Sequence, residues 1–265
     1  MARTAALSGR VAIVTGASAG IGEATARALA TAGVRVAVCA RRRQRLDELA
    51  TTISAAGGDV AVYPLDVTDG AAVRAMADQV AGRWGKIDVL VNNAGRGLSA
   101  TFEDSRPEEL RELLELNVVA AFTATQAVLP RMRRQGHGHV INVSSIVGQR
   151  GVPYRSVYSA TKFALGGLSE ALRVELAGTG IRVSLVYPIT TATEFHDVES
   201  RRAGPGLLGP VQSSEHVARC ILRCIRRPRP EVYPYWPSRL LAVANVIAPR
   251  LVDAGMGRLF RRGIR

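Results

Sequence analysis

A glycine-rich turn between an apolar run and an alanine-rich run constrains the fold of this chain more than any other feature. The β-branched run Val11–Val14 predicts a buried strand, and the segment Thr15–Gly22 (TGASAGIG) leads into a predicted helix. In this order Gly16 permits a tight turn, Gly20 leaves room for a pyrophosphate, and Gly22 lets the helix pack on the strand. The helix N-terminus offers free N–H groups to an anion, so the segment predicts a phosphate cradle. Its glycine spacing differs from GxGxxG, with three residues between the first two glycines.

Strands and helices alternate along most of the chain. The predicted strands are Val11–Val14, Val34–Cys39, Val60–Pro64, Val89–Asn92, Val140–Val143 and Arg182–Tyr187. The predicted helices between and after them are Gly22–Ala32, Arg43–Ala56, Gly70–Trp84, Pro107–Arg134, Val157–Ala177 and Ser214–Arg226. This alternation predicts an α/β fold with a doubly wound, mostly parallel sheet flanked by helices. A chain of 265 residues that is 47% hydrophobic suits one such domain.

A serine, a tyrosine and a lysine in the middle of the chain form a candidate proton-transfer site. Tyr158 and Lys162 are four residues apart, so on a helix they share one face. Ser145 follows the apolar run His139–Ser144, which predicts a buried strand. A serine can hold a carbonyl or hydroxyl oxygen and a tyrosine can pass a proton. A lysine cation stabilises the phenolate and lowers the pKa of the tyrosine.

Together these motifs resemble those of the short-chain dehydrogenase/reductase superfamily. The matching residues are TGASAGIG at Thr15–Gly22, NNAG at Asn92–Gly95, Asn117, Ser145, and Tyr158 with Lys162. The resemblance covers roughly residues 7–235, with every motif in its expected order. It implies a single-domain Rossmann fold, a nicotinamide cofactor, and hydride transfer between the cofactor and a carbonyl/alcohol pair.

The resemblance also implies which residues hold the cofactor. They are Gly16, Ser18, Gly20, Ile21, Gly22, Asp66, Val67, Asn93, Ala94, Gly95, Tyr158, Lys162, Pro188, Ile189, Thr191 and Thr193. By resemblance, Asp66 meets the adenine amino group, Val67 lines the ring, and the Asn93–Gly95 segment contacts the ribose. Asn92 is expected instead to stabilise a turn through its side chain. Ile189 stands where the family has a glycine, which predicts a different backbone and a narrower substrate pocket.

For catalysis, the resemblance assigns roles to Asn117, Ser145, Tyr158 and Lys162. The substrate oxygen is expected to accept hydrogen bonds from Ser145 and Tyr158. Tyr158 donates the proton and is recharged through the ribose hydroxyl, Lys162 and a water near Asn117. Ser144 is a second candidate serine. Tyr154 lacks a lysine one turn later.

Two arginines after the second predicted strand favour NADP(H), while NAD(H) stays possible. An NAD-selective site places an acid at this point to bind the ribose 2′-hydroxyl, and this chain has Ala40 there. Arg41, and after it Arg42, can pair with a 2′-phosphate through charge-assisted hydrogen bonds. The alternative is a solvated basic helix start.

The chain is expected to divide into a catalytic domain, residues 1–238, and a basic, partly amphipathic extension, residues 239–265. Within the domain, the Gly- and Pro-rich stretch 189–212 predicts a substrate lid, with Leu207, Leu208 and Val211 as apolar lid residues. The extension's apolar run Leu240–Ala248 falls short of the ~20 residues that span a bilayer. The extension could lie on an anionic membrane surface, or pack on the subunit or on an oligomer partner.

Composition narrows the remaining possibilities. The net charge is +13, and the stretch from Arg219 to Arg265 holds eleven arginines against two acids. A bias of arginine over lysine often reflects coding composition, and aromatic residues are not interleaved with the cations, so nucleic-acid binding is not expected. The three cysteines predict core thiols in a reducing cytoplasm rather than disulfides, and no metal site is expected. No signal peptide is evident.

These observations predict an NADP(H)-dependent oxidoreductase that interconverts a carbonyl and an alcohol on a small-to-medium apolar substrate. Two alternatives stay open: a catalytically silent nucleotide-binding scaffold that docks through its basic tail, and an epimerase or isomerase on the same fold. The intact Ser145, Tyr158 and Lys162 set argues against the scaffold. A homodimer or homotetramer is expected from the resemblance.

Overall fold

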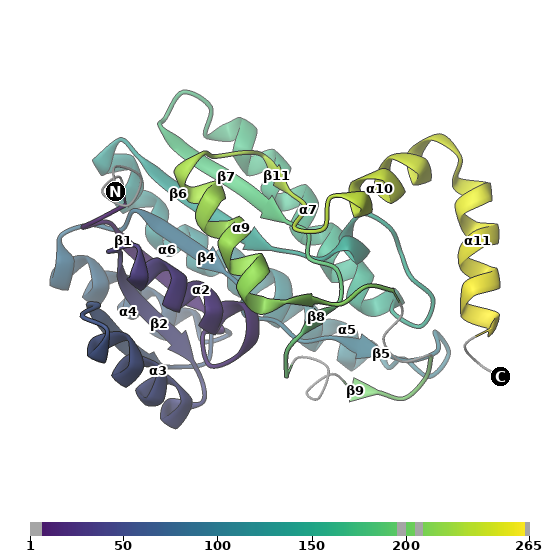
Figure 1. The fold of residues 1–265 in the computed structure, drawn as a ribbon, viewed down its shortest axis with the longest axis horizontal. Helices are drawn as coiled ribbons and strands as arrows, with labels where there is room; N and C mark the ends of the chain where they lie inside the picture. Colours follow the sequence, from purple (N-terminus) through teal and green to yellow (C-terminus); the bar gives the residue numbers. More distant parts are fainter. Residues whose placement is uncertain (1–6, 195–199, 205–208, 263–265) are drawn as a thin grey trace.

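A seven-stranded parallel sheet forms the centre of the molecule (Figure 1). The computed structural model describes residues 7–194, 200–204 and 209–262. The strand order is β3-β2-β1-β4-β6-β7-β11. The strands are β1 (Val11–Thr15), β2 (Arg35–Ala40), β3 (Val60–Pro64), β4 (Val89–Asn92), β6 (Gly138–Val143), β7 (Ile181–Val186) and β11 (Glu231–Val232). Because the chain builds outward from β1 to β3 and then returns past β1 to β4, the sheet is doubly wound, as the sequence predicts.

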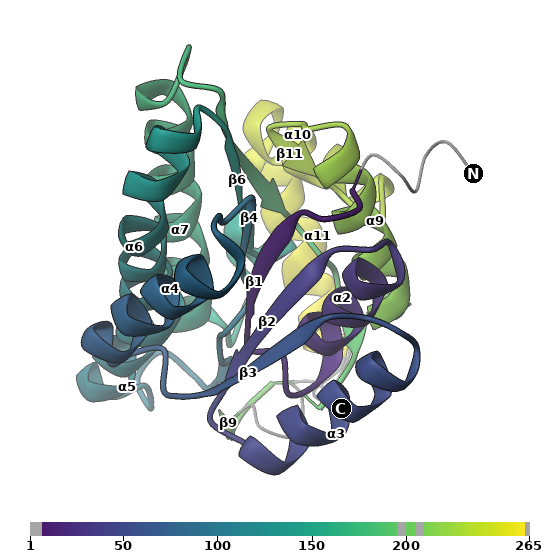
Figure 2. The same ribbon diagram turned by 90° about the vertical axis from the view of Figure 1, so that its left-hand side faces the viewer.

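Helices cover both faces of this sheet (Figure 2). One face carries α2 (Gly20–Thr31), α3 (Arg43–Ala55) and α9 (Ser214–Arg226). The other carries α4 (Gly70–Trp84), α6 (Ala120–Gln135) and α7 (Ser156–Glu175). In β1, Ala12 and Val14 join the first core while Val11 and Ile13 join the second. A strand buried on both faces needs a continuous apolar run, which explains why these strands do not alternate with polar residues.

The predicted helix Pro107–Arg134 is continuous but changes its winding in the middle. It consists of α5 (Pro107–Leu114), the π-helical segment η1 (Glu115–Val119) and α6. By length and composition this run could cross a membrane. Its inner side chains, among them Val128 and Met132, pack in the second core instead. Asn117 lies in the π-helical segment, and such segments are often found at functional sites.

Short strands and two terminal helices stand at the carboxyl edge of the sheet. In the lid region β8 (Thr191–Ala192) pairs with β10 (Gln212–Ser213), and β5 (Leu98–Ser99) pairs with β9 (Ser200–Arg201). The expected lid residues Leu207 and Leu208 lie outside the described residues, and Val211 is exposed. The extension folds into α10 (Pro237–Ile247) and α11 (Pro249–Arg262). Several element boundaries differ by a residue or two from the predicted ones, because helix and strand ends are set by local hydrogen bonds.

Candidate active site

A cavity of about 540 Å³ opens at the carboxyl ends of β1, β4, β6 and β7. It is lined by every sequence-predicted site residue except Gly22 and Asn117. Parallel strands end at the same edge, and ligands of open α/β sheets bind in the crevice beyond that edge. The structure therefore brings the glycine turn, the arginines after β2 and the Ser145–Lys162 region to one cavity.

The glycine turn has the shape of a phosphate cradle. Gly16 and Gly20 adopt φ values of +65° and +59°, which L-residues rarely take. A Cβ on Gly16 would lie 2.8 Å from Ala94 Cα, and one on Gly20 would lie 2.8 Å from Thr193 Cγ2. The N-cap of α2 is Ala19, whose methyl side chain cannot accept hydrogen bonds from the first N–H groups of the helix. These residues therefore fit a bound pyrophosphate group.

Gly22 serves the turn without lining the cavity. A Cβ on Gly22 would lie 2.3 Å from the carbonyl oxygen of Gly16 and 2.5 Å from Asn93 Nδ2. The absence of a side chain lets α2 begin directly beneath the turn. The sequence predicted packing of the helix on the strand at Gly22, and the close contacts of this position are instead with the turn after β1 and with Asn93.

Thr15, which the sequence analysis did not assign, ties the turn to the end of β4. Its Oγ1 accepts hydrogen bonds from the backbone N–H groups of Asn93, at 3.0 Å, and Ala94, at 3.1 Å. The Asn93 side chain donates to the carbonyl oxygens of Thr15 and Gly16. The side chain of Asn93 therefore holds the turn in place. Asn93 also lines the cavity, and its contact with the cofactor ribose stays a prediction. In the sequence, this role of Thr15 could have been suspected only from its place as the first residue of the glycine-rich motif.

Asn92 does not have the turn role that the sequence predicted. It is the last residue of β4 and is buried. Its Nδ2 donates to Asn142 Oδ1 of β6 at 2.8 Å and to Thr125 Oγ1 of α6 at 3.1 Å. The prediction failed because the neighbouring strand and helix supply partners that are invisible in the local sequence.

The two arginines after β2 differ in their surroundings. Arg42 donates to Ser18 Oγ at 3.1 Å and forms an ion pair with Glu194 at 2.7 Å. The side chain of Arg41 is 75% exposed and lies 3.8 Å from the carboxylate of Asp66. A hydrogen bond from the Thr68 backbone, with help from the Thr68 hydroxyl and Arg41, lowers the pKa of Asp66. Arg41 is thus the less committed of the two, and Glu194 is a rim residue that sequence analysis did not identify.

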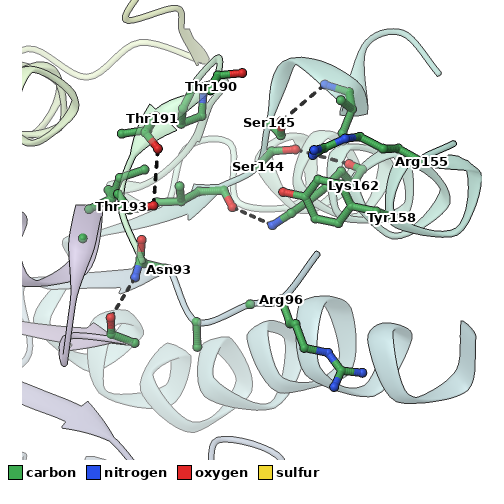
Figure 3. A pocket seen from close by; sticks show the side chains of 18 of the residues that line it. Asn93, Arg96, Ser144, Ser145, Arg155, Tyr158, Lys162, Thr190, Thr191 and Thr193 are labelled. Atoms are coloured by element: carbon green, nitrogen blue, oxygen red, sulfur yellow. Dashed lines mark hydrogen bonds between the residues drawn. The ribbon is translucent and has the colours of Figure 1, made fainter. Parts of the chain in front are cut away.

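Tyr158 and Lys162 lie side by side on α7, facing the cavity (Figure 3). Both are almost fully buried, with exposed fractions of 5% and 4%. Lys162 Nζ lies 5.7 Å from the centre of the Tyr158 ring and donates to the carbonyl oxygen of Val143 at 3.1 Å. Burial lowers the pKa of Lys162 to about 8. The ammonium group is therefore charged at neutral pH and close to the phenol.

The two neighbouring serines take different positions. Ser145 caps the short 3-10 helix η2 (Ile146–Gly148), and its Oγ accepts a hydrogen bond from the Val147 backbone at 3.4 Å. The hydroxyl of Ser144 is buried and donates to the carbonyl oxygen of Lys162 at 3.3 Å. Because Ser145 keeps its O–H free of that commitment, it is the better candidate for binding a substrate oxygen.

Asn117 supports the site from behind the cavity wall. Its Nδ2 donates to the Arg96 carbonyl and to Thr161 Oγ1, each at 3.0 Å, and its Oδ1 accepts from the Arg96 N–H. A Cβ on Gly95 would lie 2.9 Å from Asn117 Oδ1 and 3.7 Å from Lys162 Nζ. Asn117, Gly95 and Lys162 therefore converge, although Asn117 does not line the cavity.

The segment after β7 accommodates isoleucine without a left-handed backbone. Among the described non-glycine residues only Tyr154 has a positive φ, so Ile189 adopts an ordinary conformation. Ile189 lines the cavity, and its carbonyl accepts a hydrogen bond from Thr191 Oγ1 at 2.9 Å. Pro188 accepts from the Ile146 backbone. The expected bulk is present, whereas no unusual φ is required.

Both the sequence and the fold of this chain are similar to those of known proteins. Residues 10–203 match the family model described as short chain dehydrogenase. The ketoacyl reductase HetN of Nostoc sp. is 34% identical over 253 residues, covering 93% of this chain and 88% of that protein. A short chain dehydrogenase/reductase from Burkholderia phymatum in complex with NAD superposes with a TM-score of 0.85 at 26% identity, covering 92% and 95% of the two chains. A metagenomic short-chain oxidoreductase in complex with NADP gives 0.74 at 33% identity, covering 85% and 96%.

Proposed function

The chain belongs to the short-chain dehydrogenase family, and on this premise we propose that it is an NADP(H)-dependent oxidoreductase interconverting a carbonyl and an alcohol. The substrate is small to medium-sized and apolar. One observation carries the proposal. Ser145, Tyr158 and Lys162 line the same cavity as the glycine cradle, so a cofactor held by the cradle extends toward the proton-transfer groups.

The chain's own residues supply proton transfer and orientation. A bound nicotinamide supplies or accepts the hydride. Ser145 donates a hydrogen bond to the substrate oxygen, since its own Oγ already accepts from Val147. Tyr158 donates its phenolic proton to that oxygen during reduction and takes it back as phenolate during oxidation. The Lys162 ammonium, held by the Val143 carbonyl, stabilises the phenolate form of Tyr158.

The preference for NADP(H) is supported by charge at the cavity rim. Ala40 leaves no carboxylate to bind a ribose 2′-hydroxyl, and the exposed Arg41 guanidinium can pair with a 2′-phosphate. Arg42 contributes from its place between Ser18 and Glu194. The solved relatives hold either NAD or NADP, so the preference rests on these residues.

The apolar substrate class is supported by the cavity wall beyond Ser145. Ile146, Val147, Val152 and Ile189 line this part of the cavity. Apolar walls with a few convergent polar groups are typical of sites for small organic ligands. The name of the Nostoc relative, a ketoacyl reductase, is consistent with a carbonyl substrate.

The first test is a calorimetric titration of the protein with NADPH and with NADH, followed by a screen of aliphatic and aryl ketones with the preferred cofactor. We expect tighter binding of NADPH and consumption of NADPH with ketones. Binding of a cofactor without turnover of any ketone or alcohol by the parent protein would favour the silent scaffold. Conversion of an alcohol stereocentre without net change in cofactor absorbance would favour an epimerase.

We also propose that the protein forms a homodimer or homotetramer through the outer faces of α6 and α7. Phe122 on α6, and Phe163 and Val174 on α7, are exposed apolar side chains on these neighbouring helices. Exposed apolar patches of this kind mark association surfaces. Light scattering should give the mass of an oligomer, and Phe163→Glu should shift it toward the monomer. A monomeric parent protein would refute this assembly.

We further propose that the protein is cytoplasmic and that the outer face of α10 contacts an anionic membrane surface. Val246 and Ile247 are 81% and 77% exposed, Trp236 stands before the helix, and Arg239 and Arg250 are exposed. An apolar face with aromatic and cationic neighbours suits a membrane interface. Vesicles containing phosphatidylserine should sediment the parent protein but not Val246→Glu. Equal behaviour of both proteins would remove the proposal.

The cysteines support a location in a reducing compartment such as the cytoplasm. Cys39, Cys220 and Cys224 are free thiols.

A further inference from the structure

We propose that α11 is the outer wall of the substrate cavity and selects substrates with an apolar group remote from the reacting carbonyl. Met256, Leu259 and Phe260 of this helix line the same cavity as Ser145 and Tyr158. The inference rests on the proposed carbonyl chemistry for the reacting end of the substrate. It adds the residues that recognise the other end, and it gives the C-terminal extension a role in specificity.

The helix is oriented with one apolar face toward the cavity. Val252, Met256 and Phe260 are spaced four residues apart, so they share a face, and all three are partly buried. Leu251, two turns before Leu259, is 76% exposed and does not line the cavity, whereas Leu259 lines it and is 49% exposed. Figure 1 shows α10 leading away from the sheet edge and α11 turning to run past the lid side of the domain. Met256 and Phe260 of this partly buried face line the cavity, and the helix also packs against α10.

Tyr154, which has a strained backbone conformation, contacts α11 at the cavity wall. The rings of Tyr154 and Phe260 are 6.2 Å apart, centre to centre, with an interplanar angle of 35°. Tyr154 has φ +64°, and its carbonyl accepts a hydrogen bond from the Ala100 N–H at 2.8 Å. A Cβ on Gly204 would lie 2.9 Å from Tyr154 Cβ. A strained conformation persists only where its surroundings hold it, and here they set a tyrosine between the lid and α11.

Arg150 fastens the terminal helices to the segment that carries Ser145. It lies just after η2, the short helix capped by Ser145. Its guanidinium donates to Asn245 Oδ1 of α10 at 2.9 Å and pairs with Asp253 of α11. The side chains of Arg150 and Asp253 are 19% and 61% exposed, so the ion pair lies at the surface and the hydrogen bond to Asn245 is the more buried part of this link. The position of α11 is thus linked to the turn that presents the serine hydroxyl.

A substrate chemistry follows from this wall. A carbonyl compound short enough to fill only the space near Tyr158 does not reach α11. A longer aliphatic or aryl substituent that extends toward Tyr154 replaces water at Met256, Leu259 and Phe260 and gains free energy from burial. We therefore expect selectivity to rise with the apolar length of the substrate.

The test compares substitutions of α11 residues that line the cavity with one that does not. Phe260→Ala and Leu259→Ala alter lining residues, and Leu251→Ala is a matched control because it removes a leucine side chain of the same helix that lies outside the cavity. Three quantities are measured for each: kcat/KM with NADPH for 2-butanone and 2-decanone, the dissociation constant of NADPH, and the dissociation constant of 2-decanone with the protein saturated with NADP⁺, where no reduction occurs.

We expect Phe260→Ala and Leu259→Ala to weaken 2-decanone binding and lower its kcat/KM about tenfold, in the range for losing apolar contacts in a pocket. Values for 2-butanone, the NADPH dissociation constant and every value for Leu251→Ala should change less than about twofold. Equal effects on both ketones, or no binding of 2-decanone to the parent protein, would overturn the role of α11. Binding of 2-decanone that depends on Phe260 without any turnover would uphold that role and instead refute the proposed activity.

Discussion

Lys162 Nζ donates a hydrogen bond to the backbone carbonyl of Val143 at 3.1 Å, joining α7 to the last residue of β6. The contact places a cation inside the protein next to the Tyr158 ring. Because the side chain is buried, the charged form loses hydration, and the pKa of Lys162 falls to about 8. The site therefore trades stability for a charge that its chemistry needs.

This relationship predicts opposite effects of Lys162→Met on stability and activity. Removal of the buried charge should raise the melting temperature at pH 7, while turnover should fall about a hundredfold or more because the phenolate loses its cation. The folded pKa lies below the usual value of 10.5, so the cost of the charge is full below pH 8 and disappears as pH rises toward 10.5. Calorimetric scans of both proteins from pH 7 to pH 10 should show the stability advantage shrinking. A constant difference would contradict the buried-charge explanation.

A second prediction separates proton transfer from cofactor binding. Tyr158→Phe keeps the ring but removes the hydroxyl, so turnover of a ketone should fall by about two to four orders of magnitude, as expected for loss of a general acid. The NADPH dissociation constant should change less than about threefold, because the glycine cradle and Arg41 are untouched. Steady-state rates and calorimetry measure the two quantities. Ser144→Ala, which removes a hydroxyl committed to the Lys162 carbonyl, serves as the comparison and should lose much less activity.

A third prediction concerns cofactor selectivity. Arg41→Ala should weaken NADPH binding about tenfold or more, since a charge-assisted pair with the 2′-phosphate is lost, and should leave NADH binding nearly unchanged. Arg43 is a matched control because its side chain is 74% exposed and pairs with Asp47 on α3. Titrations of the parent protein, Arg41→Ala and Arg43→Ala with both cofactors give the comparison. Equal losses for NADPH and NADH in Arg41→Ala would remove the assignment.

The doubly wound parallel sheet could be predicted from local patterns, and the family resemblance supplied most of the residues that line the cavity. Apolar runs mark the buried strands, and the glycine turn and the Tyr158–Lys162 spacing place their groups at the carboxyl edge. Partners from distant parts of the chain were not predictable. Asn92 finds a partner in Asn142, and Arg42 finds one in Glu194, across separations that no window of sequence contains.

The two terminal helices, α10 and α11, also show which features could not be predicted from the sequence. The sequence indicated a basic, partly amphipathic extension, and the structure describes two helices there up to residue 262. One residue of α11, Phe260, contacts the ring of Tyr154, and the positive φ of Tyr154 has no sequence signature. The partly amphipathic character of the extension could be recognised in advance, but the place of Met256, Leu259 and Phe260 in the cavity could not.

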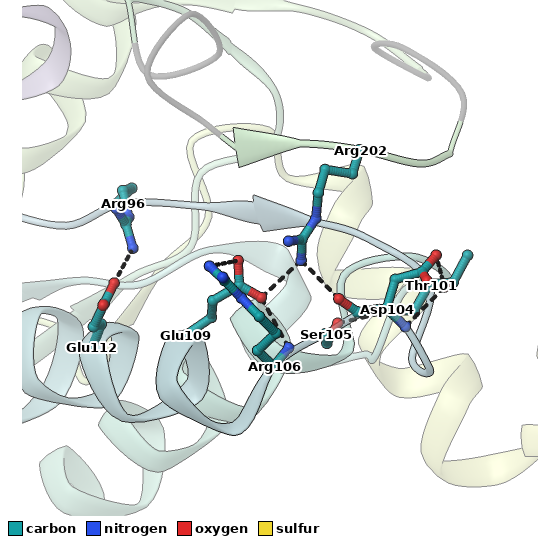
Figure 4. Close-up of polar contacts among 8 residues, drawn as sticks. All are labelled: Arg96, Thr101, Asp104, Ser105, Arg106, Glu109, Glu112 and Arg202. Atoms are coloured by element: carbon teal, nitrogen blue, oxygen red, sulfur yellow. Dashed lines mark hydrogen bonds and ion pairs between the residues drawn. The ribbon is translucent and has the colours of Figure 1, made fainter.

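A final prediction concerns Glu109 of α5, whose carboxylate binds Arg202 of the lid region and so joins the lid region to the rest of the domain (Figure 4). Glu109 accepts a hydrogen bond from Arg202 at 2.7 Å and another from the Arg106 backbone at 2.9 Å, and it is 7% exposed. The backbone bond from Arg106, then Arg202, lowers the pKa of Glu109 to about 2. Glu109→Gln should therefore destabilise the protein at pH 7 by about 1–3 kcal/mol, the range for hydrogen bonds to a charged group.

The pH dependence identifies the ionised carboxylate as the cause of that loss. The stabilisation by Glu109 is fully present above its usual pKa of 4.5 and is lost as pH falls toward 2. The difference in unfolding free energy between the parent and Glu109→Gln should consequently be constant from pH 7 to pH 5 and shrink below pH 4.5. Glu112→Gln is the control, because Glu112 pairs with Arg96 in the same region but is 64% exposed, and exposed pairs contribute about 0–1 kcal/mol. A matching loss in both variants would contradict a particular contribution of the buried Glu109 carboxylate and its bonds to Arg106 and Arg202.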